Sequence, residues 1–246
     1  SHYLGTGFAE AFDIQYLDKE GKQQYVHQTS WGVSTRIMGA LIMVHGDNRG
    51  LVVPPRVAPV QAMIIPIAQH KEGVLDKAYE LRDRLKDIIR VDIDDSDKTP
   101  GWKFNEAEMK GYPIRIEIGP RDIENNQVVA VRRDTLEKET ILMSDLETRI
   151  PELLDEIQQN LYDKALAHRE KKTTVVKNME EMKRVLEENP GFMKAMWCGD
   201  ASCEEKVKEE FSVTSRCIPF EQERLDDSCF VCGKEAKEMV YWARAY

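Results

Sequence analysis

The chain lacks any long apolar run, any excess of positive charge and any low-complexity tract. A membrane-spanning helix needs about 20 apolar residues, whereas the most apolar stretch, residues 57–68, is shorter and contains two prolines. The formal net charge of −9 argues against indiscriminate nucleic-acid binding, because phosphate affinity comes largely from Lys and Arg. The opening residues do not have the pattern of a signal peptide, and we expect none. With 41% hydrophobic and 32% charged residues, the composition is that of an ordinary soluble protein, and we expect a cytoplasmic location.

The chain also lacks an initial methionine. It opens on Ser1 and His2, and a strand-like alternation of Phe12, Ile14 and Tyr16 follows soon after. A chain that starts within a pattern is expected to be a piece of something longer. Its 246 residues correspond to roughly two domains by length alone.

Cysteine is scarce, but four of the five cysteines form two short-spaced pairs, Cys198-x4-Cys203 and Cys229-x2-Cys232. Two such pairs indicate a closed tetrahedral site for Zn²⁺ with four thiolate ligands. Two disulfides are the alternative, which a short secreted chain would favour. Gly199, Asp200 and Gly233 tolerate the positive φ angles of tight turns. Because four thiolates leave no open position, the predicted zinc is structural.

The first segment is expected to be a β-hairpin followed by a helix. Residues 10–17 alternate, residues 18–21 have turn composition, and residues 24–29 form the returning strand. Apolar residues at helical spacing then predict a helix over residues 32–45, with Thr29 or Ser30 as its N-cap. Pro54-Pro55 forbids continuation of a helix and marks a domain junction.

Residues 57–158 alternate strands and helices and predict a compact α/β domain with a mixed sheet. We expect strands at residues 61–67, 91–93, 114–118, 127–133 and 139–143, with helices at residues 74–89 and 103–110. Ser144 and Glu147 form a predicted capping box for a long helix that runs towards Arg169.

Residues 159–246 are expected to form a small α/β domain around the cysteine pairs. Strands are predicted at residues 173–176, 213–218 and 240–242, with an amphipathic helix at residues 179–188. The fifth cysteine, Cys217, lies within a predicted strand and outside both pairs, so it is expected to be a buried thiol and not a ligand.

Residues 28–36 carry chemistry that suits a phosphate. Amides and hydroxyls at a helix N-terminus favour an anion, and the Arg36 guanidinium can stack on a purine or pair with phosphate oxygens. Gly32 lets a ligand approach the backbone. An ordinary hydroxyl-capped helix start is the alternative.

From this point a family resemblance is evident. The runs that carry it are Ser30-Trp31-Gly32, Thr35-Arg36, Met43-Val44-His45-Gly46-Asp47-Asn48 and Gly50-Leu51-Val52-Val53-Pro54-Pro55-Arg56. They resemble prolyl-tRNA synthetase of the archaeal and eukaryotic type, where this segment includes motif 3 of the class II catalytic fold. Residues 99–104, 110–115 and 119–122 resemble the family's anticodon-binding domain. Residues 216–220, the cysteine quartet and Tyr246 resemble its C-terminal zinc domain.

The resemblance implies three domains: the end of the antiparallel catalytic sheet (residues 1–56), a mixed-sheet α/β anticodon-binding domain (57–158) and a small α/β zinc domain (159–246). It also implies roles for single residues. His2, Trp31 and Gly32 would form the proline pocket; Ser34, Thr35 and Arg36 would hold ATP, with Arg36 as the catalytic arginine. The residues expected to contact anticodon bases are Phe104, Glu108, Arg115, Arg121 and Asp122.

Those residue types suit single-stranded RNA, since an aromatic ring stacks on a base, arginine donates to guanine O6 and N7, and a carboxylate accepts from guanine N1 and N2. For Arg115 and Glu117, a cross-strand ion pair worth under ~1 kcal/mol is the structural alternative.

The family activates proline with ATP and Mg²⁺ and transfers it to proline tRNA as a homodimer. Motifs 1 and 2 have no counterpart in these residues, so the resemblance predicts that the chain is inactive alone. A non-catalytic tRNA-binding module and a zinc-ribbon interaction protein without an RNA role are the alternatives.

Overall fold

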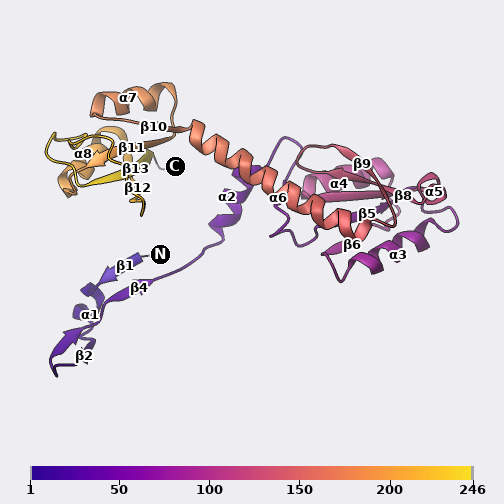
Figure 1. Ribbon diagram of the computed structural model, residues 1–246, viewed down its shortest axis with the longest axis horizontal. Helices are drawn as coiled ribbons and strands as arrows, with labels where there is room; N and C mark the ends of the chain where they lie inside the picture. Colours follow the sequence, from indigo (N-terminus) through magenta and orange to yellow (C-terminus); the bar gives the residue numbers. More distant parts are fainter. Residues whose placement is uncertain (1, 245–246) are drawn as a thin grey trace.

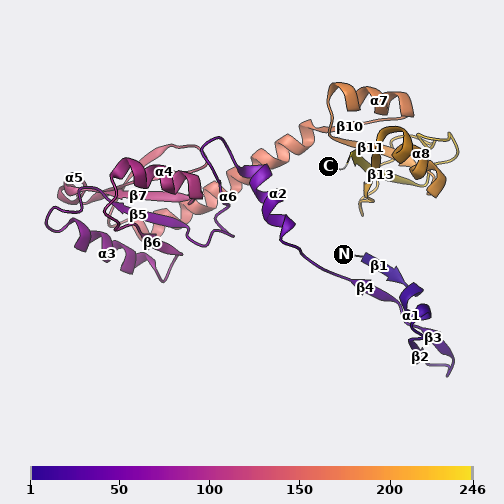
Figure 2. The ribbon, with the colours of Figure 1, turned by 180° about the vertical axis from the view of Figure 1, so that it is seen from behind.

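The computed structural model describes residues 2–244, which form an N-terminal arm, a five-stranded α/β unit and a four-stranded α/β unit (Figure 1). A long helix, α6 (Leu146–Lys171), runs from the five-stranded unit to the four-stranded one, and the view from behind shows the same arrangement (Figure 2). Tyr246 lies outside the described residues. Within them, no helix is both long and apolar enough to cross a membrane.

The N-terminal arm contains two small antiparallel pairs. Strand β1 (His2–Gly5) pairs with β4 (Gln28–Ser30), and β2 (Gln15–Leu17) pairs with β3 (Gln23–Tyr25). The predicted hairpin is therefore partly wrong, because residues 10 and 11 belong to a short helix, α1 (Gly7–Ala11). The helix predicted from residue 32 begins later, as α2 (Arg36–His45) with Thr35 as its N-cap. Thr29 and Ser30 do not cap it, because the ladder with β1 holds them in extended backbone.

The five-stranded sheet has the order β6-β5-β7-β8-β9 and mixes parallel and antiparallel pairs, as predicted. Its strands are β5 (Ala62–Pro66), β6 (Val91–Ile93), β7 (Ile114–Ile118), β8 (Gln127–Arg132) and β9 (Lys138–Leu142). Strand β5 is parallel to β6 and β7, and the other two pairs are antiparallel.

Helices cover both faces of this sheet. Ile64, Ile116 and their neighbours on one face pack in one core with α3 (Val74–Leu85) and with α6 as far as Leu161. On the other face, α4 (Pro100–Lys110) packs Phe104 and Ala107 against Met63 and Ile65. The short helix α5 (Pro120–Glu124) follows β7. The predicted domain boundary between residues 158 and 159 lies within α6, which is continuous there.

The predicted capping box at the start of α6 is wrong. Asp145 is the N-cap and makes no side-chain cap bond, while the Ser144 hydroxyl donates to Asp145. Glu147 pairs instead with Arg84, whose Nε lies 2.7 Å from Glu147 Oε1. A bidentate, charge-assisted pair is stronger than a neutral cap bond, which explains the exchange of partners.

The C-terminal sheet has the order β10-β11-β13-β12. Its strands are β10 (Thr173–Val175), β11 (Phe192–Trp197), β12 (Val213–Cys217) and β13 (Glu238–Arg244), and its helices are α7 (Met179–Glu188) and α8 (Ala201–Phe211). The core gathers around the fully buried Trp242, with Met193 and Val240 beside it. Cys217, predicted to be buried, is exposed. It ends an edge strand just after the register slips between Ser215 and Cys217, so it does not face the core.

An ion pair with one buried partner joins the arm to the five-stranded unit. The Arg133 side chain is 3% exposed, and its Nη1 and Nη2 donate to Asp47 Oδ2 at 2.8 Å and Oδ1 at 2.6 Å. These hydrogen bonds lower the pKa of Asp47 from 3.8 to about 2. The pair is therefore intact at neutral pH and loses its carboxylate charge only in strong acid.

Asp47→Asn is expected to lower the free energy of unfolding by about 1–2 kcal/mol at pH 7. That is less than the ~3–5 kcal/mol of a fully buried pair, because Asp47 is half exposed. A carboxyl group with a lowered folded-state pKa stabilises above its unfolded pKa, and this contribution is lost as the pH falls from about 4 to about 2. Urea midpoints of both proteins across this range should converge in acid; a constant difference would contradict the assignment.

Candidate metal centre and nucleic-acid interface

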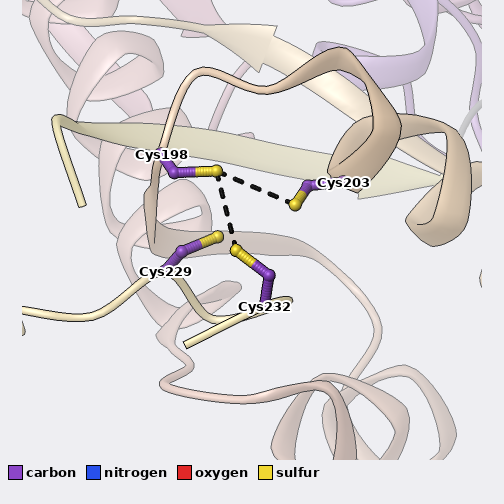
Figure 3. A group of neighbouring side chains, drawn as sticks. All are labelled: Cys198, Cys203, Cys229 and Cys232. Atoms are coloured by element: carbon purple, nitrogen blue, oxygen red, sulfur yellow. Dashed lines mark hydrogen bonds between the residues drawn. The ribbon is translucent and has the colours of Figure 1, made fainter. Parts of the chain in front are cut away.

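Two turns bring four sulfur atoms together in the C-terminal unit (Figure 3). Cys198 follows β11, and Gly199 turns the chain with φ +82°. Asp200 then caps α8 by accepting a hydrogen bond from the Ser202 amide at 3.0 Å, which places Cys203 in the first turn of the helix. Positive φ is confirmed for Gly199 but not for Asp200, whose φ is −89°.

The second turn runs from Cys229 to Lys234. The Gly233 amide donates to the Cys229 carbonyl at 2.9 Å, and Gly233 has the predicted positive φ. The Phe230 amide donates to the Met196 carbonyl at 3.0 Å, which docks this turn onto β11.

The geometry of the quartet fits a tetrahedral metal ion. The four Sγ atoms lie within 4.8 Å of one another, and Cys198 Sγ lies 3.7 Å from that of Cys203 and 3.8 Å from that of Cys232. A tetrahedron with metal–sulfur bonds of about 2.3 Å has sulfur–sulfur edges of about 3.8 Å. All five cysteines are free, so the disulfide alternative is wrong. The quartet can therefore hold a metal ion.

The electrostatics of the quartet also suit a cation. Burial raises the pKa of Cys198 and of Cys203, whereas the Lys234 backbone amide lowers the pKa of Cys232 to about 7. A divalent cation would deprotonate coordinating thiols outright and neutralise the charge that burial disfavours.

Three of the predicted anticodon residues meet on one face of the five-stranded sheet. Arg115 from β7 places its guanidinium carbon 4.3 Å from the centre of the Phe104 ring, which comes from α4. Arg115 Nη1 lies 3.2 Å from Glu108 Oε1, and Arg115 Nε donates to Glu117 Oε1 at 2.9 Å. The structural alternative is thus confirmed in part: Arg115 does pair with Glu117, but along one strand and not across two, and it also pairs with Glu108 from α4.

Arg115 and Glu117 are buried, Phe104 and Glu108 are half-buried, and the charged groups pair with one another. Arg115 and Glu117 are 7% and 6% exposed. Burial alone would raise the pKa of Glu108, but hydrogen bonds from Arg49 and Arg115 outweigh it, so this pKa lies below its usual value. Glu108 is therefore an ionised acceptor at neutral pH, held beside an aromatic face and a guanidinium.

The two remaining predicted residues lie beyond the other end of β7. Asp122 accepts from the Gly119 amide at 2.9 Å at the start of α5, and Arg121 is exposed. Gly119 lies four positions after Arg115, a distance of about 13 Å along the strand. Within residues 2–244, no hydrogen bond or ion pair joins Arg121 or Asp122 to the Phe104 cluster.

The predicted proline and ATP residues lie along the arm. His2 is the register partner of Ser30, which places it beside Trp31 at the end of the β1–β4 pair. Trp31 is 81% exposed, and Gly32, Ser34, Thr35 and Arg36 are exposed as well. Thr35 makes no side-chain cap bond.

Sequence reasoning missed Arg49 and Lys138. Arg49 Nη1 lies 3.0 Å from Glu108 Oε2, and Lys138 Nζ lies 3.5 Å from Glu117 Oε2. Arg49 is distant from Glu108 in the chain and sits in a turn, so nothing in the local pattern points to the contact. Lys138 is on β9, two strands away from Glu117 on β7, so the predicted hairpin does not point to that contact either.

Two known protein families match parts of the chain. The family described as "Anticodon binding domain" matches residues 61–153, and the family described as "Prolyl-tRNA synthetase, C-terminal" matches residues 179–246.

Whole-chain relatives extend the match to the arm. A proline–tRNA ligase of Oceanobacillus iheyensis is 71% identical over all 246 residues, and one of Clostridium novyi is 62% identical. These matches cover 51% and 52% of the two relatives, so the chain spans about half the length of the curated relatives it matches.

Among solved structures, the prolyl-tRNA synthetase of Cryptosporidium parvum complexed with halofuginone and AMPPNP superposes with a TM-score of 0.91. It is 42% identical, and the match covers all of this chain and 53% of that one. The same enzyme complexed with L-proline and AMP matches equally well, with 54% of its chain covered. The whole chain is therefore similar to about half of a prolyl-tRNA synthetase, and residues 179–246 match the C-terminal family of these enzymes.

Proposed function

We propose that this chain supplies the end of the catalytic domain, the anticodon-binding domain and a structural zinc domain of a proline–tRNA ligase. The observation that carries the proposal is the cluster of Phe104, Glu108 and Arg115, which presents an aromatic face, an ionised carboxylate and a guanidinium together. These groups suit an unstacked guanine, whose face stacks and whose edge offers both donors and acceptors. The match to an anticodon-binding family over residues 61–153 supports the same assignment.

The complete enzyme would form prolyl-adenylate from proline and ATP and would then transfer the prolyl group to tRNA. The proline carboxylate would attack the α-phosphate of ATP, with Mg²⁺ present and pyrophosphate as the leaving group, and the tRNA 3′ end would then displace AMP. The chain's part is positioning and charge stabilisation. Ser34, Thr35 and Arg36 would hold the nucleotide, with His2, Trp31 and Gly32 beside the proline. The AMPPNP and the L-proline with AMP bound to the Cryptosporidium enzyme support these ligands.

We assign zinc to the four-cysteine cluster because tetrahedral coordination by four thiolates is typical of structural zinc. Such a site supplies folding energy and takes no part in the reaction. Arg121 and Asp122, both on α5, are further proposed tRNA contacts.

The apolar side chains of α2 support a larger assembly. Ile37, Ile42 and Val44 are exposed on a helix with no buried residue, and an apolar surface of this kind marks a contact. We propose that the remainder of a class II catalytic domain covers them, in a cytoplasmic homodimer.

The anticodon assignment is tested by Phe104→Ala in the full-length protein that carries this chain. Loss of one stacked base is expected to weaken binding of proline tRNA roughly 10- to 100-fold. Phe104→Leu, which keeps apolar volume for the core, should lose nearly as much affinity, because a leucine has no face for stacking.

Trp102→Ala is the matched control. Trp102 is a half-exposed aromatic residue on the same helix, two positions away, and its ring lies against Lys98 instead of Arg115. Its replacement should leave the dissociation constant within about twofold. Equal losses for both aromatic residues, or none for Phe104→Leu, would refute the proposed recognition surface.

A further inference from the structure

The turn that follows α2 is packed tightly onto the helix that carries Phe104 and Glu108. The Leu51 amide donates to the Met109 carbonyl at 3.0 Å, and the Val53 amide donates to the Gly111 carbonyl at 3.2 Å. Gly50 has φ +136°, and a Cβ atom added there would lie 2.5 Å from Met109 Cα. The turn and the C-terminal end of α4 therefore form one closely fitted unit.

Arg49 extends from this turn to Glu108. Its Nη1 donates to Glu108 Oε2 at 3.0 Å, while Arg115 donates to the other oxygen at 3.2 Å. Asp47 anchors the turn by accepting from the Arg49 amide at 2.8 Å and from the Arg133 guanidinium. Arg133 in turn donates to the Glu108 carbonyl at 2.9 Å. The carboxylate of Glu108 is thus held by Arg49, from the segment that precedes the anticodon-binding match, and its carbonyl is held by Arg133, which pairs with Asp47 of that segment.

We infer that Arg49 is a positioning residue for guanine recognition, which orients the Glu108 carboxylate together with Arg115. This inference rests on the proposed function. Each carboxylate oxygen has two acceptor sites, so the two arginines occupy one on each oxygen and leave one on each for the N1–H and N2–H groups of a guanine. The two arginines together fix the plane of the Glu108 carboxylate, and with it the direction of its two free acceptor sites.

The exposure of Arg49 makes it possible to distinguish a role in recognition from a purely structural role. The Arg49 side chain is 57% exposed and that of Glu108 is 16% exposed. An ion pair with one exposed partner contributes little to folding stability. Its removal is therefore expected to change RNA recognition and to leave the melting temperature nearly unchanged.

The test compares Arg49→Ala and Arg49→Lys in the full-length protein with the control Arg82→Ala. Arg82 pairs with the exposed Asp83 on α3, which covers the opposite face of the sheet. The probes are a proline tRNA transcript and a transcript in which the anticodon guanines are replaced by adenines. Arg49→Ala should weaken binding of the first transcript roughly fivefold, and should reduce the preference between the two by a similar factor.

Arg49→Lys should retain more of the preference between the two transcripts than Arg49→Ala does. Arg82→Ala should match the wild type in both affinity and preference. In a double-mutant cycle, Arg49→Ala should add little once Glu108→Gln is present, because both act through one carboxylate. Wild-type preference in Arg49→Ala, or additive losses in the cycle, would overturn the inference alone. A wild-type protein without any preference would overturn the proposed function and this inference with it.

Discussion

The full-length protein is expected to carry one zinc ion per chain at the four-cysteine cluster, and Cys203→Ser is expected to lose the ion together with much of the C-terminal fold. The metal would join the β11–α8 turn to the turn at residues 229–234. The segment between β12 and β13, residues 218–237, contains no helix or strand and is held by separate contacts such as the hydrogen bond from the Phe230 amide to the Met196 carbonyl, so a metal ion would add to its order. At such sites metal-binding free energy is folding free energy.

The loss should be several kcal/mol, yet smaller than the ~10–16 kcal/mol of zinc-finger peptides. The core around Trp242 forms without metal contacts and should retain part of the fold. Elemental analysis gives the zinc content, and amide hydrogen exchange over residues 192–244 reports the local stability.

Cys217→Ser is the matched control, because Cys217 is exposed and is not among the four clustered thiols. It should keep one zinc ion and wild-type exchange protection. Full protection in Cys203→Ser after chelation would show that the cluster does not stabilise the fold through a metal.

Arg36→Ala is expected to reduce proline-dependent ATP–pyrophosphate exchange by the full-length protein at least about 100-fold. The guanidinium would stabilise charge that develops on the phosphates, and loss of one such preorganised group costs about 10²–10³ in rate. Arg36 is exposed at the first position of α2, so its removal should change the melting temperature little.

Arg184→Ala on α7 serves as the control, since Arg184 is also an exposed helical arginine but lies in the C-terminal unit. It should exchange at the wild-type rate. Wild-type exchange by Arg36→Ala would remove Arg36 from the catalytic machinery. A full-length wild type that binds tRNA without exchange would instead support the non-catalytic tRNA-binding module.

The sequence was most informative where burial or covalent chemistry dictates the pattern. The apolar run of β5 and the isoleucines of β7 are typical of strands that are buried inside a sheet. The cysteine spacing likewise predicted the cluster, because two short turns each present two thiols. The first position of α2 was harder to predict, since pairing of Thr29 and Ser30 with β1 overrides their preference for capping.

Other features depend on partners that are remote in the chain. Strand β11 and helix α8 were missed because Met and Ala in β11, and the Glu- and Lys-rich start of α8, give no clear periodicity. Glu147 pairs with Arg84, and Glu108 with Arg49, over 63 and 59 residues of chain. Such contacts appear only once the fold is known, and they decide which carboxylates cap helices and which hold arginines.

The most direct test of anticodon recognition uses the wild-type full-length protein and two proline tRNA transcripts that differ only in the anticodon. The quantity to measure is the ratio of kcat/KM for aminoacylation with proline. Replacing the guanines is expected to lower kcat/KM by at least about 10-fold per base, since each good base contact contributes ~1–3 kcal/mol of discrimination. Equal kcat/KM for the two transcripts would contradict the assignment of Phe104, Glu108 and Arg115 to the anticodon.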